Sequence, residues 1–171
     1  MPAPVEALGW VAGSAVLQLD SYDDPEQGGW GRRQKSALGA AVEIELRRGA
    51  RGNAEATKRA VFSLKQQRAL LDPVWGGVYQ YSSASTWDKP HYEKLMPYQA
   101  ANLEAYARGY AATKDAAFLA DAQGIAGYLG TFLSTPEGAF LPSQDADAAS
   151  FGLRGPLPRR ALPRDRRRRA P

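Results

Sequence analysis

The chain has 171 residues, of which 44% are hydrophobic, and it contains no cysteine. This is the length of one ordinary domain with enough apolar side chains to form a core. The lack of cysteine excludes disulfides, thiolate metal sites and redox CxxC motifs. No apolar run approaches the roughly 18 residues of a membrane helix, and the N-terminus lacks the basic start of a secretory signal. We therefore expect a cytoplasmic protein that does not cross a membrane.

The net charge of +4 is unevenly distributed. Residues 152–171 hold eight arginines and one aspartate, so the rest of the chain is mildly acidic. This distribution argues against a nucleic-acid-binding domain, although such a tail can bind phosphate backbones. The alternative hypothesis is that the reading frame is lost near residue 149. We divide the chain into a domain at 1–148 and a basic tail at 149–171, and favour truncation or frame loss over a functional tail.

Apolar residues at spacings of three and four predict a series of helices. Asn53 and Asp115 are suited to cap two of them, and Pro97 fits the first turn of another. The predicted helices cover residues 4–20, 37–48, 54–71, from 91 or 97 to 113, and a segment after Asp115 that includes Phe118, Ala122, Ile125, Leu129 and Phe132. In the first, Val5, Leu8, Val11 or Ala12, and Ala15 or Val16 recur at these spacings. No strand with period two is visible, so the predicted fold class is all-α, an array of helical hairpins.

The last predicted helix contains three glycines, at positions 124, 127 and 130. Each lowers helix propensity by about 1 kcal/mol relative to alanine. We therefore expect the close approach of a neighbouring helix to compensate for them.

The segment from Asp72 to Ala100 has the composition of a site. It holds the only histidine, His91, and the adjacent Gly76 and Gly77, at which the backbone can turn sharply. A histidine near a carboxylate such as Glu93 is suited to acid/base chemistry. The alternative is that His91 is a helix cap or a hydrogen-bonded loop residue.

Other side chains are candidates for the same site. Asp145 and Asp147 could supply carboxylates opposite the histidine, or they could accept hydrogen bonds from loop amides. Tyr81, Trp87 and Trp75 could stack on a sugar ring, or they could be packing residues.

An acidic loop follows the first predicted helix. It contains Asp20, Asp23, Asp24 and Glu26, which do not follow the ligand spacing of an EF-hand. We favour a solvated turn that lines the mouth of the site over a calcium loop, and we predict no metal and no cofactor.

Three motifs occur in order along the chain. The first consists of Asp24, Gly28-Gly29-Trp30-Gly31 and Lys35. The second consists of Gly76-Gly77, Tyr81-Ser82, Trp87 and Pro90-His91-Tyr92-Glu93-Lys94-Leu95-Met96. The third consists of Pro136-Glu137-Gly138-Ala139-Phe140 and Asp145-Ala146-Asp147. Together they resemble the spermatogenesis-associated or YyaL-type family of thioredoxin-domain proteins over residues 15–148.

The resemblance implies an α/α toroid, similar to sugar epimerases and six-hairpin glycosidases, of which this chain would form part. It implies His91, Glu93, Asp145 and Asp147 as catalytic groups. The candidates for substrate contact are Tyr81, Trp87, Lys94, Tyr98 and Trp30. The alternative for Lys94 is a structural ion pair. Compared with the family, Gln80 replaces an arginine, Pro97 a tyrosine and Tyr98 an aspartate, which favours a shifted substrate.

Two hypotheses on function remain from the sequence. The first is a carbohydrate-active or carbohydrate-binding toroid that acts on a sugar-like small molecule by acid/base chemistry, as epimerases or glycosidases do. The second is a non-catalytic interaction module that binds a thioredoxin-like domain or protein.

Overall fold

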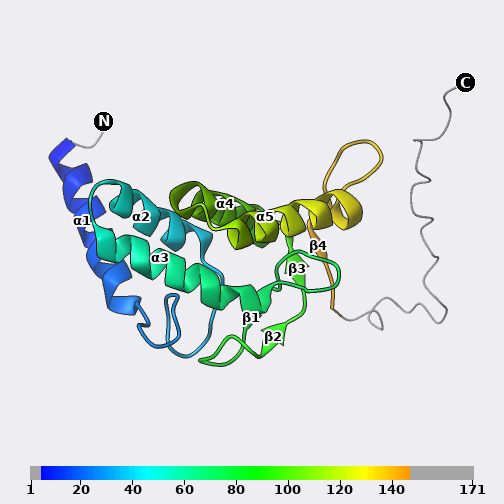
Figure 1. The fold of residues 1–171 in the computed structure, drawn as a ribbon, viewed down its shortest axis with the longest axis horizontal. Coiled ribbons are helices and arrows are strands. Elements are labelled where there is room, and N and C mark those ends of the chain that lie inside the picture. The colour runs from blue at the N-terminus through cyan, green and yellow to red at the C-terminus, as the bar shows by residue number, and fades with distance from the viewer. Residues whose placement is uncertain (1–4, 147–171) are drawn as a thin grey trace, which may run out of the picture.

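The computed structural model describes residues 5–146, and it is mostly helical (Figure 1). The helices are α1 (Val5–Tyr22), α2 (Gly39–Ala50), α3 (Ala54–Gln67), the 3-10 turn η1 (Arg68–Leu70), α4 (Met96–Thr113), α5 (Ala116–Tyr128) and the π-helical η2 (Leu129–Leu133). The strands are β1 (Tyr81–Ser82), β2 (Pro90–His91), β3 (Lys94–Leu95) and β4 (Ser143–Gln144). Strands of only two residues confirm the all-α prediction. None of the helices in residues 5–146 is long and apolar enough to cross a membrane.

Short and long connections alternate along the chain. Residues 51–53 join α2 to α3, and residues 114–115 join α4 to α5. Helices joined by such short turns run antiparallel. The long segments 23–38, 71–95 and 134–146 therefore emerge at the opposite end from these turns. That end, which we call the long-loop end, carries the residues that the sequence singled out.

The predicted caps are present. Asn53 accepts a hydrogen bond from the Ala56 amide, and Asp115 accepts one from the Ala117 amide. Each side chain satisfies a backbone donor that the first helical turn leaves free. Lys114 ends α4 in the left-handed conformation, with φ of 61°. Pro97 lies in the first turn of α4, where its missing N–H costs nothing.

The core lies between the two hairpins. α2 packs beside α4 so closely that a side chain at Gly39 would meet the Ala101 carbonyl oxygen at 2.5 Å. Tyr106 of α4 donates a hydrogen bond from its hydroxyl to the Leu64 carbonyl. The largest fully buried apolar side chains are Leu64, Leu70, Tyr106, Phe118, Ile125, Tyr128 and Leu133.

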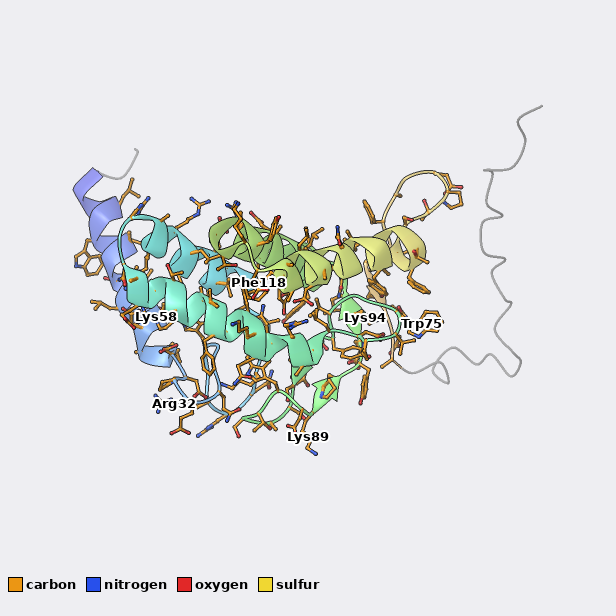
Figure 2. The ribbon with its side chains drawn as sticks, viewed as in Figure 1. Arg32, Lys58, Trp75, Lys89, Lys94 and Phe118 are labelled. Atoms are coloured by element: carbon orange, nitrogen blue, oxygen red, sulfur yellow. The ribbon has the colours of Figure 1, made fainter. Side chains whose placement is uncertain are left out.

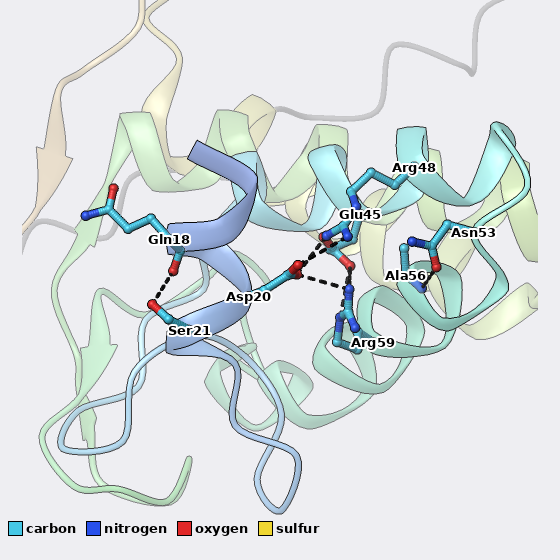
Figure 3. Close-up of polar contacts among 8 residues, drawn as sticks. All are labelled: Gln18, Asp20, Ser21, Glu45, Arg48, Asn53, Ala56 and Arg59. Carbon is cyan, nitrogen blue, oxygen red and sulfur yellow. Dashed lines mark hydrogen bonds and ion pairs between the residues drawn. The ribbon is translucent and has the colours of Figure 1, made fainter. Parts of the chain in front are cut away.

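Helix α1 is attached through its last turns. Leu19 packs against the core, and the Asp20 carboxylate accepts hydrogen bonds from Arg48 of α2 (2.8 Å) and Arg59 of α3 (3.2 Å). The same two arginines bind Glu45, whose side chain is fully buried (Figure 3). This ion-pair network joins three helices, and most of α1 extends beyond it.

The predicted first helix is present as α1, but most of the apolar residues whose spacing predicted it are exposed where the structure describes their side chains. Leu8 is 59% exposed and Val11 is 56% exposed. Helical spacing identifies which residues share a face, but it does not show that another element covers that face.

No neighbouring helix packs on the glycines of α5 and η2 within residues 5–146, contrary to our expectation; the close approach at Gly124 comes from the loop residue Gly76. A Cβ atom at Gly124, Gly127 or Gly130 would meet no heavy atom within 4 Å. The predicted helix at 54–71 ends its regular α-helical part at Gln67 and tightens into η1.

Candidate active site at the long-loop end

The first long loop is built around a buried lysine. Lys35 Nζ donates to Asp24 Oδ2 at 2.6 Å and to the carbonyl oxygens of Gly28 and Gly31, each at 2.9 Å. The other Asp24 oxygen accepts the amides of Glu26 and Gln27. All three N–H groups of the ammonium therefore have acceptors. We call residues 23–35 the first Asp–Lys loop.

The second long loop repeats this arrangement. Lys94 Nζ donates to Asp72 Oδ2 at 2.6 Å and to the Gly76 carbonyl at 2.8 Å. Asp72 Oδ1 accepts the amides of Val74 and Trp75. We call residues 71–94 the second Asp–Lys loop. In place of a third oxygen, the Lys94 ammonium lies 4.3 Å from the centre of the Tyr128 ring.

The two loops share a sequence signature that our sequence analysis missed. Residues 24–29 are DPEQGG and residues 72–77 are DPVWGG, so aspartate, proline and the glycine pair recur at identical spacing. The glycines of both pairs have φ between 69° and 79°, which other residues rarely adopt. The lysine spacing differs, 11 residues from Asp24 and 22 from Asp72, which hides the repeat.

Backbone pairing joins successive loops. The amide and carbonyl of Lys35 pair with those of Ser82, and β3, which contains Lys94, pairs with β4 of the third loop. Each buried lysine thus lies where one loop contacts the next, so the Asp–Lys pairs hold the long-loop end together.

The aromatic residues of the second loop gather around His91. The imidazole stacks on Tyr81, with ring centres 4.3 Å apart and an interplanar angle of 14°. Tyr79 and Tyr92 meet edge to face at 5.0 Å. Trp75, which is 63% exposed, instead meets Phe132 of η2 edge to face at 5.5 Å, and Lys94 lies behind it, nearer the helices (Figure 2). We call Tyr79, Tyr81, His91, Tyr92 and Trp75 the aromatic surface. The buried Asp72–Lys94 pair lies behind it.

The structure brings His91 and Glu93 together. Nδ1 of His91 lies 3.6 Å from Glu93 Oε2, which is buried and has no hydrogen-bond partner among the described residues. The two residues lie in and beside short strands rather than on a helix, and alternate residues of an extended chain point the same way. The β3–β4 register pairs Lys94 with Gln144, so Glu93 and Asp145 each lie one residue beyond the last pair of this short ladder.

Burial shifts the pKa values of the groups behind this surface. Burial alone would raise the pKa of Asp72, but the Lys94 ammonium and two backbone amides outweigh it and lower the pKa. Burial also lowers the pKa of Lys94, against the opposing effect of Asp72. Burial and the nearby Asp72 raise the pKa of Tyr79 to about 12. Tyr79 therefore stays protonated at neutral pH, with its hydroxyl hydrogen-bonded to the Asp72 carboxylate.

Several candidate contact residues lie inside the protein. Trp30 and Trp87 are buried, and the Trp87 indole donates to the Gln27 carbonyl at 2.8 Å. Lys94 is 3% exposed and bound to Asp72, in agreement with the alternative of a structural ion pair. Tyr98 is half-buried in the first turn of α4. Asp147 lies outside the described residues.

A cleft of about 500 Å³ lies between the second Asp–Lys loop and α5. Arg68, Asp72, Gly76, Asp121 and Gly124 are among its lining residues, and His91 is not. Burial raises the pKa of Asp121, although Arg68 opposes this shift. A ligand of His91 would therefore lie on the open aromatic surface and not in this cleft.

The acidic first loop is committed to ion pairs. Asp20 faces two arginines and Asp24 faces Lys35, so neither aspartate is directed at a shared cation position. Among residues 5–146, no group of three or more acidic, histidine or cysteine side chains could hold a metal ion.

No family model matches the chain. The human and rat proteins called spermatogenesis-associated protein 20 are each 28% identical to it over 138 residues, which cover 77% of this chain. Those residues make up 18% of each relative, so the chain spans less than a fifth of their length. This weak homology agrees with the family resemblance of the motifs.

Solved structures match the fold at low sequence identity. A sugar epimerase from a ruminal bacterium has a TM-score of 0.66 and 17% identity, over 76% of this chain and 37% of the epimerase. Cellobiose 2-epimerase from Spirochaeta thermophila has a TM-score of 0.62 and 18% identity, over 82% of this chain and 41% of the enzyme. A D-mannose isomerase has a TM-score of 0.55 and 18% identity, over 67% of this chain and 31% of the isomerase. The described chain therefore has the fold of part of an α/α toroid, with weak homology to spermatogenesis-associated protein 20.

Proposed function

We propose that the long-loop end binds a sugar-like molecule and that His91 transfers a proton to or from it. The observation that carries this proposal is the contact between His91 Nδ1 and the buried Glu93 oxygen, on an imidazole that stacks on Tyr81. A carboxylate behind one imidazole nitrogen orients the ring and leaves the other nitrogen for a ligand. This is the arrangement of an acid/base group.

The aromatic surface supports a sugar as the ligand class. Trp75 and Tyr92 are 63% and 59% exposed, and a sugar ring presents C–H groups that pack on such faces. Tyr98, half-buried in the first turn of α4, is the proposed source of a hydroxyl group, and Asp145, which directly follows β4, is the proposed second carboxylate. Asp147 is proposed with it from the sequence alone. No metal or cofactor takes part in the proposed step.

The epimerase fold indicates the reaction class within this proposal. Epimerisation or isomerisation removes a proton from a carbon next to a carbonyl group and returns one to a carbon, which requires a base and an acid but no added nucleophile. His91 is the proposed base, and Asp145 is the proposed acid. A glycosidase-like step would use two carboxylates instead. His91 would have no role in such a step.

Solvent exchange tests this function. The chain is incubated with mannose or cellobiose in D2O, and the sugar proton signals are followed by NMR. We expect loss of the proton next to the carbonyl carbon with the wild type and no loss with His91→Gln. Lys89→Ala, a change at an exposed position of the same loop, should exchange like the wild type. Exchange that is equal in wild type and His91→Gln, or absent with both sugars, would refute the assignment.

Ligand binding is tested apart from chemistry. A sugar ligand should raise the melting temperature of the wild type but not of Tyr92→Ala, since Tyr92 is an exposed part of the aromatic surface. No rise across a broad sugar panel would favour the second function, a non-catalytic module that binds a thioredoxin-like domain. The exposed apolar surface of α1 is the observation that favours this alternative.

A further inference from the structure

Helix α1 exposes apolar side chains to an unusual extent. Trp10 is 75% exposed and Leu17 is 73% exposed. Every residue from Leu8 to Ala15 is exposed, and no charged residue occurs between residues 7 and 19. A helix that is apolar on all sides is normally buried, and a surface helix carries charges on its outer face. The described part of α1 therefore has the composition of a buried helix in an exposed position.

The opposite end of the array has an outer face that suits such a helix. The exposed residues of α5 and η2 are small or uncharged: Ala116, Ala120, Gln123, Gly124, Ala126, Gly127, Gly130 and Thr131. The charged residue in this stretch, Asp121, is bound by Arg68. In Figure 1, α1 lies at one end of the array, whereas α5 continues into η2 towards the other.

The two surfaces are complementary in the size of their side chains, and both are uncharged. α1 presents large side chains, whereas open space lies above Gly124, Gly127 and Gly130. Small residues on one helix let the large side chains of another fill the grooves between its turns. Joining these faces would bury no unpaired charge, because neither contributes one.

The interface would also continue a contact that the chain already uses. Within the array, α2 approaches α4 closely because Gly39 has no side chain against the Ala101 carbonyl. Successive loops pair through their backbones, Lys35 with Ser82 and Lys94 with Gln144.

We propose that the occupant of this face is α1 from a second copy of the chain, which packs on the small-residue face of α5 and η2. The contact joins two different surfaces, so it gives a closed pair if it is reciprocal and a ring or filament if it is not. This inference does not depend on the proposed sugar chemistry.

Single-face variants of the full chain test the proposal. Light-scattering chromatography should give the wild type a mass of at least twice the 18.5 kDa of one chain. Trp10→Glu, which alters α1 only, and Gly127→Glu, which alters the α5 face only, should each be monomeric. Circular dichroism checks that both remain folded, as expected at exposed positions. Val74→Glu, at a loop residue with 74% exposure, is the matched control and should associate like the wild type.

Mixing the two monomeric variants gives the decisive result. Trp10→Glu retains an intact α5 face and Gly127→Glu retains an intact α1, so an equal mixture should form a dimer although neither variant does alone. A wild type that is monomeric at about 100 µM, a concentration well above the Kd of stable complexes, would overturn the proposal. So would association that survives Gly127→Glu, or a wild type that floats with phosphatidylcholine vesicles instead of self-associating.

Discussion

Replacing Lys94 by methionine should destabilise the protein strongly. Methionine keeps most of the length of the side chain but removes the ammonium, which donates to Asp72 and to the Gly76 carbonyl. The side chains of Lys94 and Asp72 are 4% and 7% exposed, so the Asp72 carboxylate would remain buried without its counter-ion.

The magnitude follows from the lost contacts. Hydrogen bonds to charged groups contribute about 1.5 to 3 kcal/mol each, and removing one partner of a buried ion pair costs about 3 to 5 kcal/mol. We therefore expect Lys94→Met to lower the free energy of unfolding by about 4 kcal/mol. A domain is stable by only about 5 to 15 kcal/mol, so this loss is a large fraction of the total.

Urea denaturation followed by circular dichroism measures the effect. With a slope of about 2 kcal/mol per M, the midpoint should fall by about 2 M. Lys58→Met, which breaks the exposed pair with Glu55 on α3, is the control and should leave the midpoint unchanged. Figure 2 shows Lys58 on the surface, whereas Lys94 lies behind the second loop.

A double variant separates the lost contact from the unpaired charge. Asp72→Asn keeps an acceptor for the two backbone amides but removes the charge, so Lys94→Met/Asp72→Asn should be more stable than Lys94→Met alone. A loss below about 1 kcal/mol for Lys94→Met, within the range of a surface pair, would refute the reasoning. So would a double variant that is no more stable than the single one.

Three further predictions concern the same scaffold. Asp24 and Asp72 have pKa values below the unfolded value of 3.8, so the unfolded chain binds more protons than the folded one. The free energy of unfolding should therefore fall as the pH drops from about 4 to about 2. In urea titrations, Asp24→Asn/Asp72→Asn should make the free energy of unfolding depend less on pH over this range. Glu45→Gln should cost about 2 kcal/mol in the same assay, because the amide keeps the shape of this fully buried side chain but loses its charge between two arginines; an unchanged midpoint would contradict this. Gly77→Ala should cost about 2 kcal/mol or more, since its φ is 79° and a Cβ would lie 2.6 Å from the Tyr128 ring; equal thermal melts of variant and wild type would show that the loop relaxes freely.

Much of the fold could be predicted because it depends on local chemistry. Asn53 and Asp115 cap helices, and Pro97 begins one, through contacts within two or three residues along the chain. Apolar spacing also predicted the four helices from α2 to α5, and most of their ends were predicted to within a few residues. Such features need no knowledge of what lies across the core.

The exposure of individual side chains could not be predicted in the same way. Leu8 belongs to an apolar helical pattern, and Trp87 was a candidate for either sugar stacking or packing. Leu8 faces solvent, whereas Trp87 is buried against the first loop. Burial depends on which distant segment covers a residue, and spacing along one helix or loop does not contain that information. The sequence pointed to His91 and Glu93 together but could not establish contact between their side chains, because that contact depends on an extended backbone where a helix remained an option.

The repeated loops change what the family-like motifs mean chemically. In the two Asp–Lys loops the aspartates and glycine carbonyls accept hydrogen bonds from the lysines, and Trp87 hydrogen-bonds to the first loop. Their shared role is to hold two loops in one geometry and to join each loop to the next. Of the titratable groups named in the second motif, Lys94 is buried, whereas His91 and Glu93 remain partly exposed at the surface of the second loop. Most of the motif therefore forms the scaffold, and any acid/base chemistry at this end must come from the few residues that the scaffold leaves available to a ligand.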